Sequence, residues 1–300
     1  MENLFENCKL CPRRCGADRT AGKTGFCGMP DVPVANLIRL HYGEEPIISG
    51  KSGSGTVFFE GCSLGCVFCQ NYTISRGPTG HGISMDSDSL SDAYLKLQDE
   101  GANNINLVTP MHFAPVVADS VAKAKSSGLV IPVAVNCSGY DLVSTLRLFD
   151  GLIDIYMPDM KYFSSKISTE YSHAADYFSV CASAIDEMVR QTDGIVMGDD
   201  GLIKKGVIVR HLILPGALFD SKHIIDYLTS RYGNRIYIIQ SKLCLRKRCA
   251  NAAVHLLNML SGRNLRHHAA IHRVKRDLGR NDVRQNFPSV SHDSRRGLIA

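Results

Sequence analysis

The sequence has no tryptophan, and aromatic residues make up only 7% of its 300 positions. It also lacks any apolar run near the roughly 18 residues that a membrane-spanning helix needs. Its start has no basic flank followed by an apolar core, so we expect no secretory signal, a cytoplasmic location and no membrane partner. With 44% hydrophobic and 21% charged residues, the composition is typical of a folded globular chain.

The net charge of +5 is confined to the end of the chain. Residues 241–300 hold 13 Lys and Arg against 3 Asp and Glu (+10), whereas residues 1–240 hold 21 against 26 (−5). We expect this basic tail to be irregular, either disordered or loosely packed. Its lone aromatic residue is Phe287, which is too little to stack nucleotide bases, so nucleic acid is not an expected partner.

Cysteine, by contrast, is abundant, with 11 residues. A reducing cytoplasm argues against a disulfide framework, so thiolate ligands are the better interpretation. Cys137 and Cys181 have no partner at metal-ligand spacing and are expected in the core, while Cys244 and Cys249 fall in the basic tail. The remaining seven form two groups.

Short β-branched runs alternate with helix-sized segments between about residues 55 and 240, a pattern that predicts crossover connections and a parallel sheet. Helices are expected to end at the glycines that a left-handed C-cap favours. The expected strands are residues 55–60, 104–109, 131–135, 153–157, 206–214 and 235–239, and the expected helices include 86–100, 114–127 and 142–149.

Six strand-helix units predict an α/β fold, an open partial TIM-type (β/α)6 barrel. Residues 1–50 show no clear periodicity and form a Cys-rich, loop-rich extension in this interpretation. We therefore expect three regions, the extension 1–50, the (β/α)6 core 51–240 and the basic tail 241–300.

The sharpest motif is Cys62-x3-Cys66-x2-Cys69, which directly follows the first expected strand. Three soft thiolates can hold three irons of a cubane cluster and leave the fourth without a protein ligand. Loops after parallel barrel strands are also where barrels place their active sites. The alternatives are an incomplete zinc site or a set of buried structural cysteines.

This spacing, with aromatic Phe68 just before the third cysteine, resembles the radical S-adenosylmethionine (SAM) superfamily. The segments Gly55-Thr-Val-Phe-Phe-Glu-Gly-Cys62, Cys69-Gln-Asn-Tyr72 and Cys11-Pro-Arg-Arg-Cys15 are similar to an uncharacterised branch related to pyruvate formate-lyase activating enzymes. The resemblance covers roughly residues 5–240. It implies a [4Fe-4S] cluster on Cys62, Cys66 and Cys69 that binds SAM and, when reduced, cleaves it to methionine and a 5′-deoxyadenosyl radical.

The resemblance also implies SAM contacts at strand ends, although each residue could instead serve as a cap or a salt-bridge partner. Thr109 stands where the superfamily usually has a glycine-rich segment with an acidic residue, a departure that puts the amino-group contact in doubt. The other segments are Asn136-Cys-Ser-Gly-Tyr140, the Asp-x-Lys of Asp159 and Lys161, and the segment that begins at Arg210. The candidates are Thr109, Asn136, Ser138, Asp159, Lys161 and Arg210.

The second cysteine group lies in the extension and has the spacing Cys8-x2-Cys11-x3-Cys15-x11-Cys27. Four thiols in a segment too short for its own core can close a structural zinc site or an auxiliary iron-sulfur cluster, and the spacing suits both.

The leading functional hypothesis is a radical SAM oxidoreductase that activates a glycyl radical enzyme, with flavodoxin or ferredoxin as the reductant. That partner rests on the resemblance alone. Two alternatives stay open: radical SAM modification of RNA or a small molecule, and a non-catalytic iron-sulfur or zinc protein.

Overall fold

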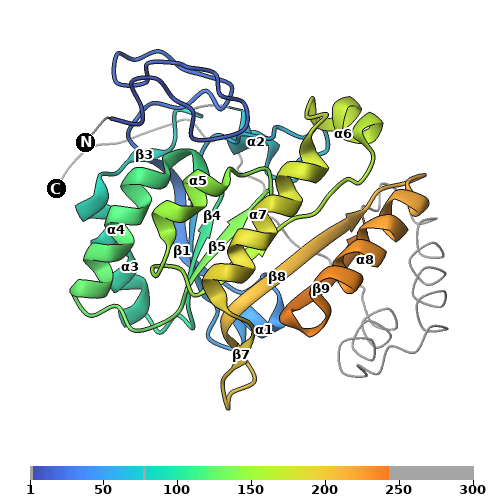
Figure 1. The fold of residues 1–300 in the computed structure, drawn as a ribbon. Helices are drawn as coiled ribbons and strands as arrows, with labels where there is room; N and C mark the ends of the chain where they lie inside the picture. The colour runs from blue at the N-terminus through green and yellow to red at the C-terminus, as the bar shows by residue number, and fades with distance from the viewer. Residues whose placement is uncertain (1–2, 77–78, 243–300) are drawn as a thin grey trace, which may run out of the picture. The chain divides into compact units, whose positions relative to one another are not determined.

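The computed structural model is built around one mixed β-sheet with helices packed against it (Figure 1). It describes residues 3–76 and 79–242. The expected basic tail, except for its first two residues, therefore lies outside the described residues, as do Cys244 and Cys249. Among the described residues, no helix is long and apolar enough to cross a membrane.

The strands are β1 Val34–His41, β2 Ser54–Phe59, β3 Ile83–Ser84, β4 Ile105–Val108, β5 Val133–Cys137, β6 Ile155–Pro158, β7 Val196–Met197, β8 Ile203–Ile213 and β9 Ile236–Lys242. The α-helices are α1 Pro46–Ser49, α2 Tyr72–Ser75, α3 Ser87–Asp99, α4 Ala114–Ser126, α5 Val143–Leu146, α6 Ser165–Ser172, α7 Tyr177–Thr192 and α8 Leu218–Tyr232. Single 3₁₀ turns occur at η1 Met111–Phe113, η2 Arg147–Phe149 and η3 Gly233–Arg235.

Six of these strands pair in parallel and in chain order, β2-β4-β5-β6-β8-β9. They coincide within a few residues with the six strands expected from the sequence. Strands β4 and β5 are buried at every position, which is typical of a parallel sheet covered on both faces. Within the described residues the sheet stays open, because β9 pairs only with β8.

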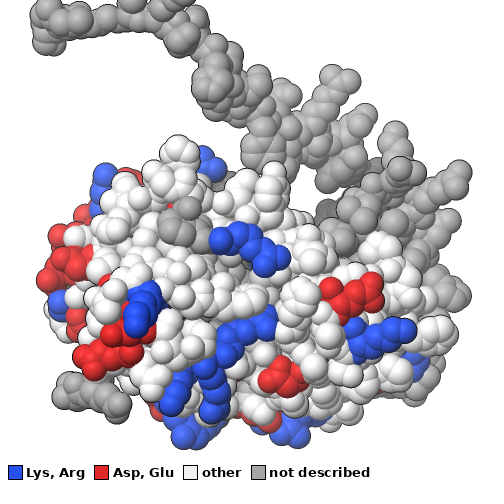
Figure 2. All heavy atoms as spheres, turned by 90° about the horizontal axis from the view of Figure 1, so that it is seen from above, with Lys and Arg blue, Asp and Glu red and all other residues white. Residues whose placement is uncertain are grey.

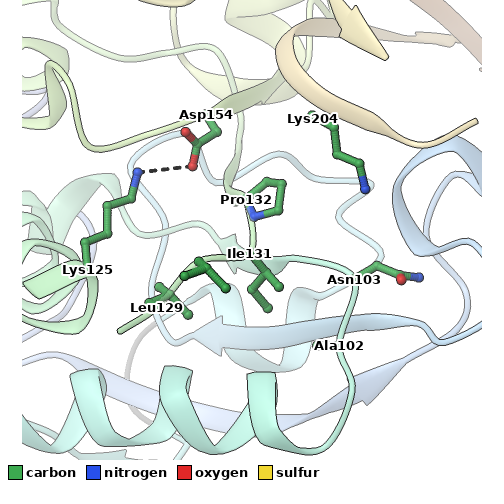
Figure 3. Close-up of a pocket in the computed structure, with 9 residues that line it drawn as sticks. Ala102, Asn103, Lys125, Leu129, Ile131, Pro132, Asp154 and Lys204 are labelled. Carbon is green, nitrogen blue, oxygen red and sulfur yellow. Dashed lines mark hydrogen bonds and ion pairs between the residues drawn. The ribbon is translucent and has the colours of Figure 1, made fainter. Parts of the chain in front are cut away.

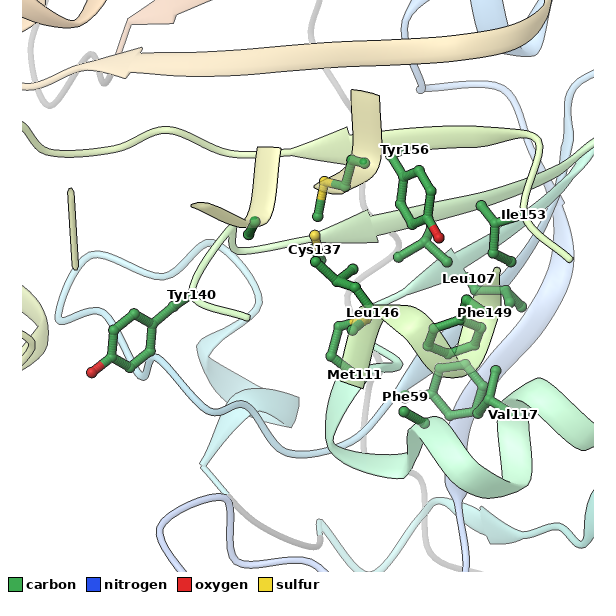
Figure 4. Close-up of a cluster of buried hydrophobic side chains, with 14 of the residues drawn as sticks. Phe59, Leu107, Met111, Val117, Cys137, Tyr140, Leu146, Phe149, Ile153 and Tyr156 are labelled. Carbon is green, nitrogen blue, oxygen red and sulfur yellow. The ribbon is translucent and has the colours of Figure 1, made fainter. Parts of the chain in front are cut away.

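The carboxyl ends of these strands meet at one edge, and the N-terminal segment lies at that edge (Figure 1). Helices α3, α4, α7 and α8 cover one face of the sheet (Figure 1). Their core includes Phe59, Met111, Val117 and Phe149, which pack against one another (Figure 4). The opposite face carries a smaller apolar cluster in which Ile48 of α1 packs against strands β5, β6 and β8.

The helix ends follow the expected glycine pattern. Helix α3 begins after Asp86, whose carboxylate accepts the Ser89 N–H. Helices α3 and α4 are followed by Gly101 and Gly128, both with positive φ, where a residue with a side chain would be strained. The expected helix 142–149 is divided into α5 and the turn η2.

The N-terminal region differs from expectation, because it contains the short helix α1 and a strand. Residues 34–41 were expected in a loop, but they form β1, which pairs antiparallel with β2 and β3. Asn36, Arg39 and His41 interrupt its apolar pattern because β1 is mostly half-buried. The signal that identifies a fully buried strand is therefore weak in this segment.

Candidate functional site

The loop that carries Cys62, Cys66 and Cys69 leaves the carboxyl end of β2, where the sequence placed it. Cys66 is buried, and Cys62 and Cys69 are half-buried. Backbone hydrogen bonds hold the loop: Gly61 N–H donates to the Ile74 carbonyl (2.7 Å) and Val67 N–H to the Tyr171 carbonyl at the end of α6 (2.9 Å). The Phe68 ring packs edge-on against Tyr162 and Tyr171. The loop is thus fixed to two different elements.

The three thiols are close enough to act on one another electrostatically. Burial raises the pKa of Cys62 to about 11, and the neighbouring Cys66 and Cys69 thiols add to the rise. The Leu64 N–H points at Cys62 Sγ (3.4 Å) and opposes it. Neither these thiols nor any other three His, Cys, Asp or Glu side chains in residues 3–76 and 79–242 are arranged as a ready-made metal site. The chemistry of these three thiols nevertheless fits an iron-sulfur cluster, because soft thiolates are the usual ligands of such clusters.

Four of the predicted cofactor contacts lie together at the carboxyl edge of the sheet. Arg210 Nη2 donates to Asn136 Oδ1 (2.5 Å), and Arg210 Nε donates to Asp159 Oδ1 (3.0 Å). The other carboxylate oxygen of Asp159 accepts from Lys161 Nζ (2.5 Å). Strands β5, β6 and β8 are neighbours, and their parallel direction brings these side chains to one place. The result is a mostly buried, charged network.

This network connects electrostatically to the cysteine loop. Burial alone would raise the pKa of Asp159, but the Arg210 and Lys161 cations outweigh it and hold the carboxyl pKa below its ordinary value. Burial likewise would lower the pKa of Lys161, yet the Asp159 carboxylate and then the Cys66 thiol raise it. Lys161 is therefore held by its acid partner Asp159, and the next residue, Tyr162, packs its ring edge-on against Phe68 of the cysteine loop.

Thr109 and Ser138 are near this network but are not part of it. Thr109 follows β4 with φ of 59°, a left-handed conformation that is rare for a β-branched residue, and its N–H donates to the Asn136 carbonyl (2.8 Å). Ser138 Oγ accepts the Tyr140 N–H (3.4 Å), so its hydroxyl is engaged in a local turn. Their predicted contacts with SAM stay predictions.

The four N-terminal cysteines also form a group. Cys8, Cys11 and Cys27 are buried and Cys15 is exposed. Burial raises the pKa of Cys11 to about 12, and the other three thiols add to the rise. Burial also raises the pKa of Cys27 against the lowering influence of the Arg19 cation. All four thiols therefore lie within electrostatic reach of one another in a segment without regular secondary structure.

Sequence reasoning missed Tyr177 and Glu44. The Tyr177 hydroxyl accepts the Lys161 N–H (3.0 Å) and donates to the Asp159 carbonyl (2.7 Å), so it fixes the backbone of the Asp-x-Lys segment from α7. Glu44 Oε2 lies 4.0 Å from Arg210 Nη1. No local pattern identifies either residue, because each reaches the site from a distant part of the chain.

Two cavities lie at opposite edges of the sheet. One, of about 620 Å³, is lined by Lys125, Asp154, Lys204 and neighbours at the amino ends of β5, β6 and β8, away from the cysteines (Figure 3). The other, of about 580 Å³, lies at the carboxyl edge and is lined by Phe163, Phe219, His223 and neighbours just beyond the Asp-x-Lys segment. The second cavity begins two residues beyond Lys161, and none of the candidate site residues lines it.

The surface at this edge is not strongly charged. Seen from the side of the N-terminal segment, Lys and Arg are interspersed with Asp and Glu, and most of the visible described surface is uncharged (Figure 2). Such a surface does not resemble the basic stripe that marks a nucleic-acid interface.

Comparison with known proteins gives limited information. No protein-family model matches the chain. It is 26% identical over 245 residues to an uncharacterized protein of Methanocaldococcus jannaschii, a match that covers 78% of this chain and only 65% of that protein. Among solved structures it is similar to Streptococcus suis SuiB bound to S-adenosylmethionine, with a TM-score of 0.45, 11% identity and coverage of 74% of this chain and 44% of that one. It is also similar to methylornithine synthase (PylB), with a TM-score of 0.45, 14% identity and coverage of 68% and 60%. Scores of this size do not establish a shared fold.

Proposed function

We propose that this chain is a radical SAM iron-sulfur enzyme whose six parallel strands form the core of an open (β/α)6 barrel. The observation that carries the proposal is the placement of the Cys62-x3-Cys66-x2-Cys69 loop at the carboxyl end of β2, the edge of the sheet at which Arg210 binds Asn136 and Asp159. A cysteine motif of this spacing in a structural zinc site would not need a network of one buried Asn and half-buried Arg, Asp and Lys side chains at the same edge of the sheet.

In this proposal Cys62, Cys66 and Cys69 hold the cluster, which when reduced supplies the electron that cleaves the sulfonium of SAM to methionine and a 5′-deoxyadenosyl radical. The chain itself binds and orients. Lys161 and Arg210 offer cationic donors, while Asn136 and Asp159 offer acceptors for the polar groups of SAM. Their burial keeps water away from the reacting atoms.

The N-terminal thiols Cys8, Cys11, Cys15 and Cys27 are proposed to hold a second metal, either zinc or an auxiliary iron-sulfur cluster. Their mutual electrostatic influence and the burial of three of them support one shared site. Metal binding would deprotonate these thiols and add to the order of a segment whose own apolar cluster is small, with Phe5, Cys8 and Leu10 as its buried members.

The substrate is proposed to be a protein, a glycyl radical enzyme that loses a hydrogen atom from a backbone glycine, with flavodoxin or ferredoxin as the electron donor. The open sheet and the cavity beside the Asp-x-Lys segment support access by a macromolecular loop. If a protein loop could not enter the open barrel, a small-molecule substrate would be favoured instead.

The test is anaerobic reconstitution of the full chain, followed by a count of iron and zinc and a dithionite assay for 5′-deoxyadenosine from SAM. We expect about four irons on the first cysteine group and formation of 5′-deoxyadenosine. Iron or zinc found beyond these four irons would be assigned to the N-terminal thiols. A chain that keeps its iron yet never cleaves SAM would contradict the proposal and favour a non-catalytic role.

A further inference from the structure

Arg13, which lies between Cys11 and Cys15, reaches out of the N-terminal segment to the cysteine loop of β2. Its Nε donates to the Ser63 carbonyl (2.9 Å) and its Nη2 to the Leu64 carbonyl (3.0 Å). Both carbonyls belong to the stretch between Cys62 and Cys66. The N-terminal segment therefore holds the loop directly, through two backbone carbonyls.

The same guanidinium also binds the end of α6. Nη2 donates to the Ser172 carbonyl (2.7 Å) and Nη1 to the His173 carbonyl (2.5 Å). The last carbonyls of a helix have no partner within it and favour a nearby cation. Arg13 thus uses four hydrogen bonds to join the cysteine loop to α6, an arrangement that suits the rigid, planar fork of arginine and not the single ammonium of lysine.

The base of this side chain lies inside the N-terminal cysteine group. The turn around it is closed by hydrogen bonds from Arg14 N–H to the Cys11 carbonyl and from Gly16 N–H to the Cys8 carbonyl, each 3.0 Å. The guanidinium lies 4.0 Å above the ring of Phe26, the neighbour of Cys27. Anything that orders the N-terminal thiols also orders the turn from which Arg13 extends.

We infer that Arg13 is a positioning residue that clamps the Cys62–Cys69 loop and makes its geometry depend on the N-terminal cysteine segment. The consequence for a cluster on that loop rests on the function proposed above. The clamp itself does not, because it consists of contacts within the protein.

The test compares the full-length chain, reconstituted anaerobically, with Arg13→Ala, Arg13→Lys and the matched control Arg14→Ala, which removes an exposed arginine from the next position. One measurement is amide hydrogen exchange of peptides covering residues 61–70, which include the bonded N–H groups of Val67 and Cys69. The other is the electron paramagnetic resonance spectrum of the dithionite-reduced cluster. Exchange in α8 reports whether each variant is folded.

For Arg13→Ala we expect exchange in residues 61–70 to rise by about tenfold or more, because several charge-assisted hydrogen bonds are lost. The resonance spectrum should change as well, ethylguanidinium should partly restore both, and Arg14→Ala should match the wild type. Arg13→Lys should not restore them, which separates fork geometry from charge.

Unchanged exchange in a folded Arg13→Ala variant would overturn the inference, and so would full restoration by lysine. If the wild type forms no cluster, the proposed function fails, while the exchange comparison still decides whether Arg13 is a clamp.

Discussion

The two cysteine groups of this chain are held in place by different means. Cys62, Cys66 and Cys69 lie on a loop fixed by a buried parallel strand, by α6 and by aromatic contacts. The N-terminal cysteines lie in a segment without helix or strand from residue 3 to residue 33, apart from turns. That segment is held by two arginines, Arg13 and the fully buried Arg19, which donates to the carbonyl of His112 (2.6 Å).

The difference indicates a division of labour. A site on rigid elements can keep its donors in place before any cofactor binds, which favours catalysis. A site on irregular chain gains its order from the bound metal, which favours a structural or regulatory role. The predictions below test this contrast, starting with the change of largest expected effect.

The contrast is sharpest when one cysteine of each group is changed. Under the proposed function, Cys66→Ser should abolish SAM cleavage, because it removes one of the three proposed cluster ligands, whereas Cys8→Ser should reduce it only in part. The measurement is 5′-deoxyadenosine formed under dithionite, normalised to iron content. Equal survival of cleavage in both variants would remove the distinction between the groups.

The charged network lies at the carboxyl edge of the sheet, like the Cys62–Cys69 loop. Asp159→Asn should remove its ion pairs with Arg210 and Lys161. The variant leaves the Arg210 and Lys161 cations without their carboxylate, which should lower the free energy of unfolding by about 3 kcal/mol. Because the pKa of Asp159 is held below its ordinary value of 3.8, this stabilisation is present above that pH and is lost as the pH falls through the lowered pKa.

Urea unfolding of wild type and variant checks this, and Asp150→Asn is the matched control. Asp150 pairs with Arg190 on the exposed surface, so its removal should cost less than about 1 kcal/mol. Equal costs for the two variants would show that Asp159 lies in a more hydrated site than its contacts imply.

The sequence predicted the parallel sheet and the residues at its carboxyl edge better than it predicted the N-terminal region. Strand β5 is buried at every position and begins with the apolar run Val-Ala-Val, and the parallel order of such strands brings Asn136, Asp159 and Arg210 to one edge. The sequence did not predict strand β1, because half-buried strands carry a weaker pattern.

Two features of the site correspond to no recognisable pattern in the sequence. Arg13 stands in a motif that the sequence did single out, but its partners are backbone carbonyls, which any residue provides. The left-handed backbone of Thr109 depends on tertiary contacts that override the local preference of a β-branched residue. The residues of the network were predictable as candidates, but the clamp that Arg13 forms on the cysteine loop was not.

The buried acid Asp141 should make the free energy of unfolding of the chain depend on pH. Burial raises the pKa of Asp141 to about 6, although the Cys137 thiol and the Gly139 N–H oppose the rise. Because the folded pKa is raised, the chain is most stable below the ordinary value of 3.8 as far as this group is concerned, and stability is lost as the pH rises through about 6.

Asp141→Asn should remove this loss, which amounts to about 2 kcal/mol between roughly pH 4 and pH 8. Urea unfolding at the two pH values measures it. An Asn variant that keeps the full pH dependence of the wild type would assign the effect to another group.

The smallest expected effect concerns accessibility within the N-terminal group. The thiolate is the reactive form of cysteine, and Cys15 is exposed whereas Cys11 is buried with a pKa raised to about 12. After chelation, iodoacetamide should therefore modify Cys15 at least about tenfold faster than Cys11, as mass spectrometry of timed samples would show. With metal bound, both should be protected, because ligation removes the free thiolate from each. A Cys15 that reacts equally fast before and after chelation is no ligand. The N-terminal metal would then depend on the three buried thiols, and the exposed edge of the segment would be free to change without disturbing the loop that Arg13 holds.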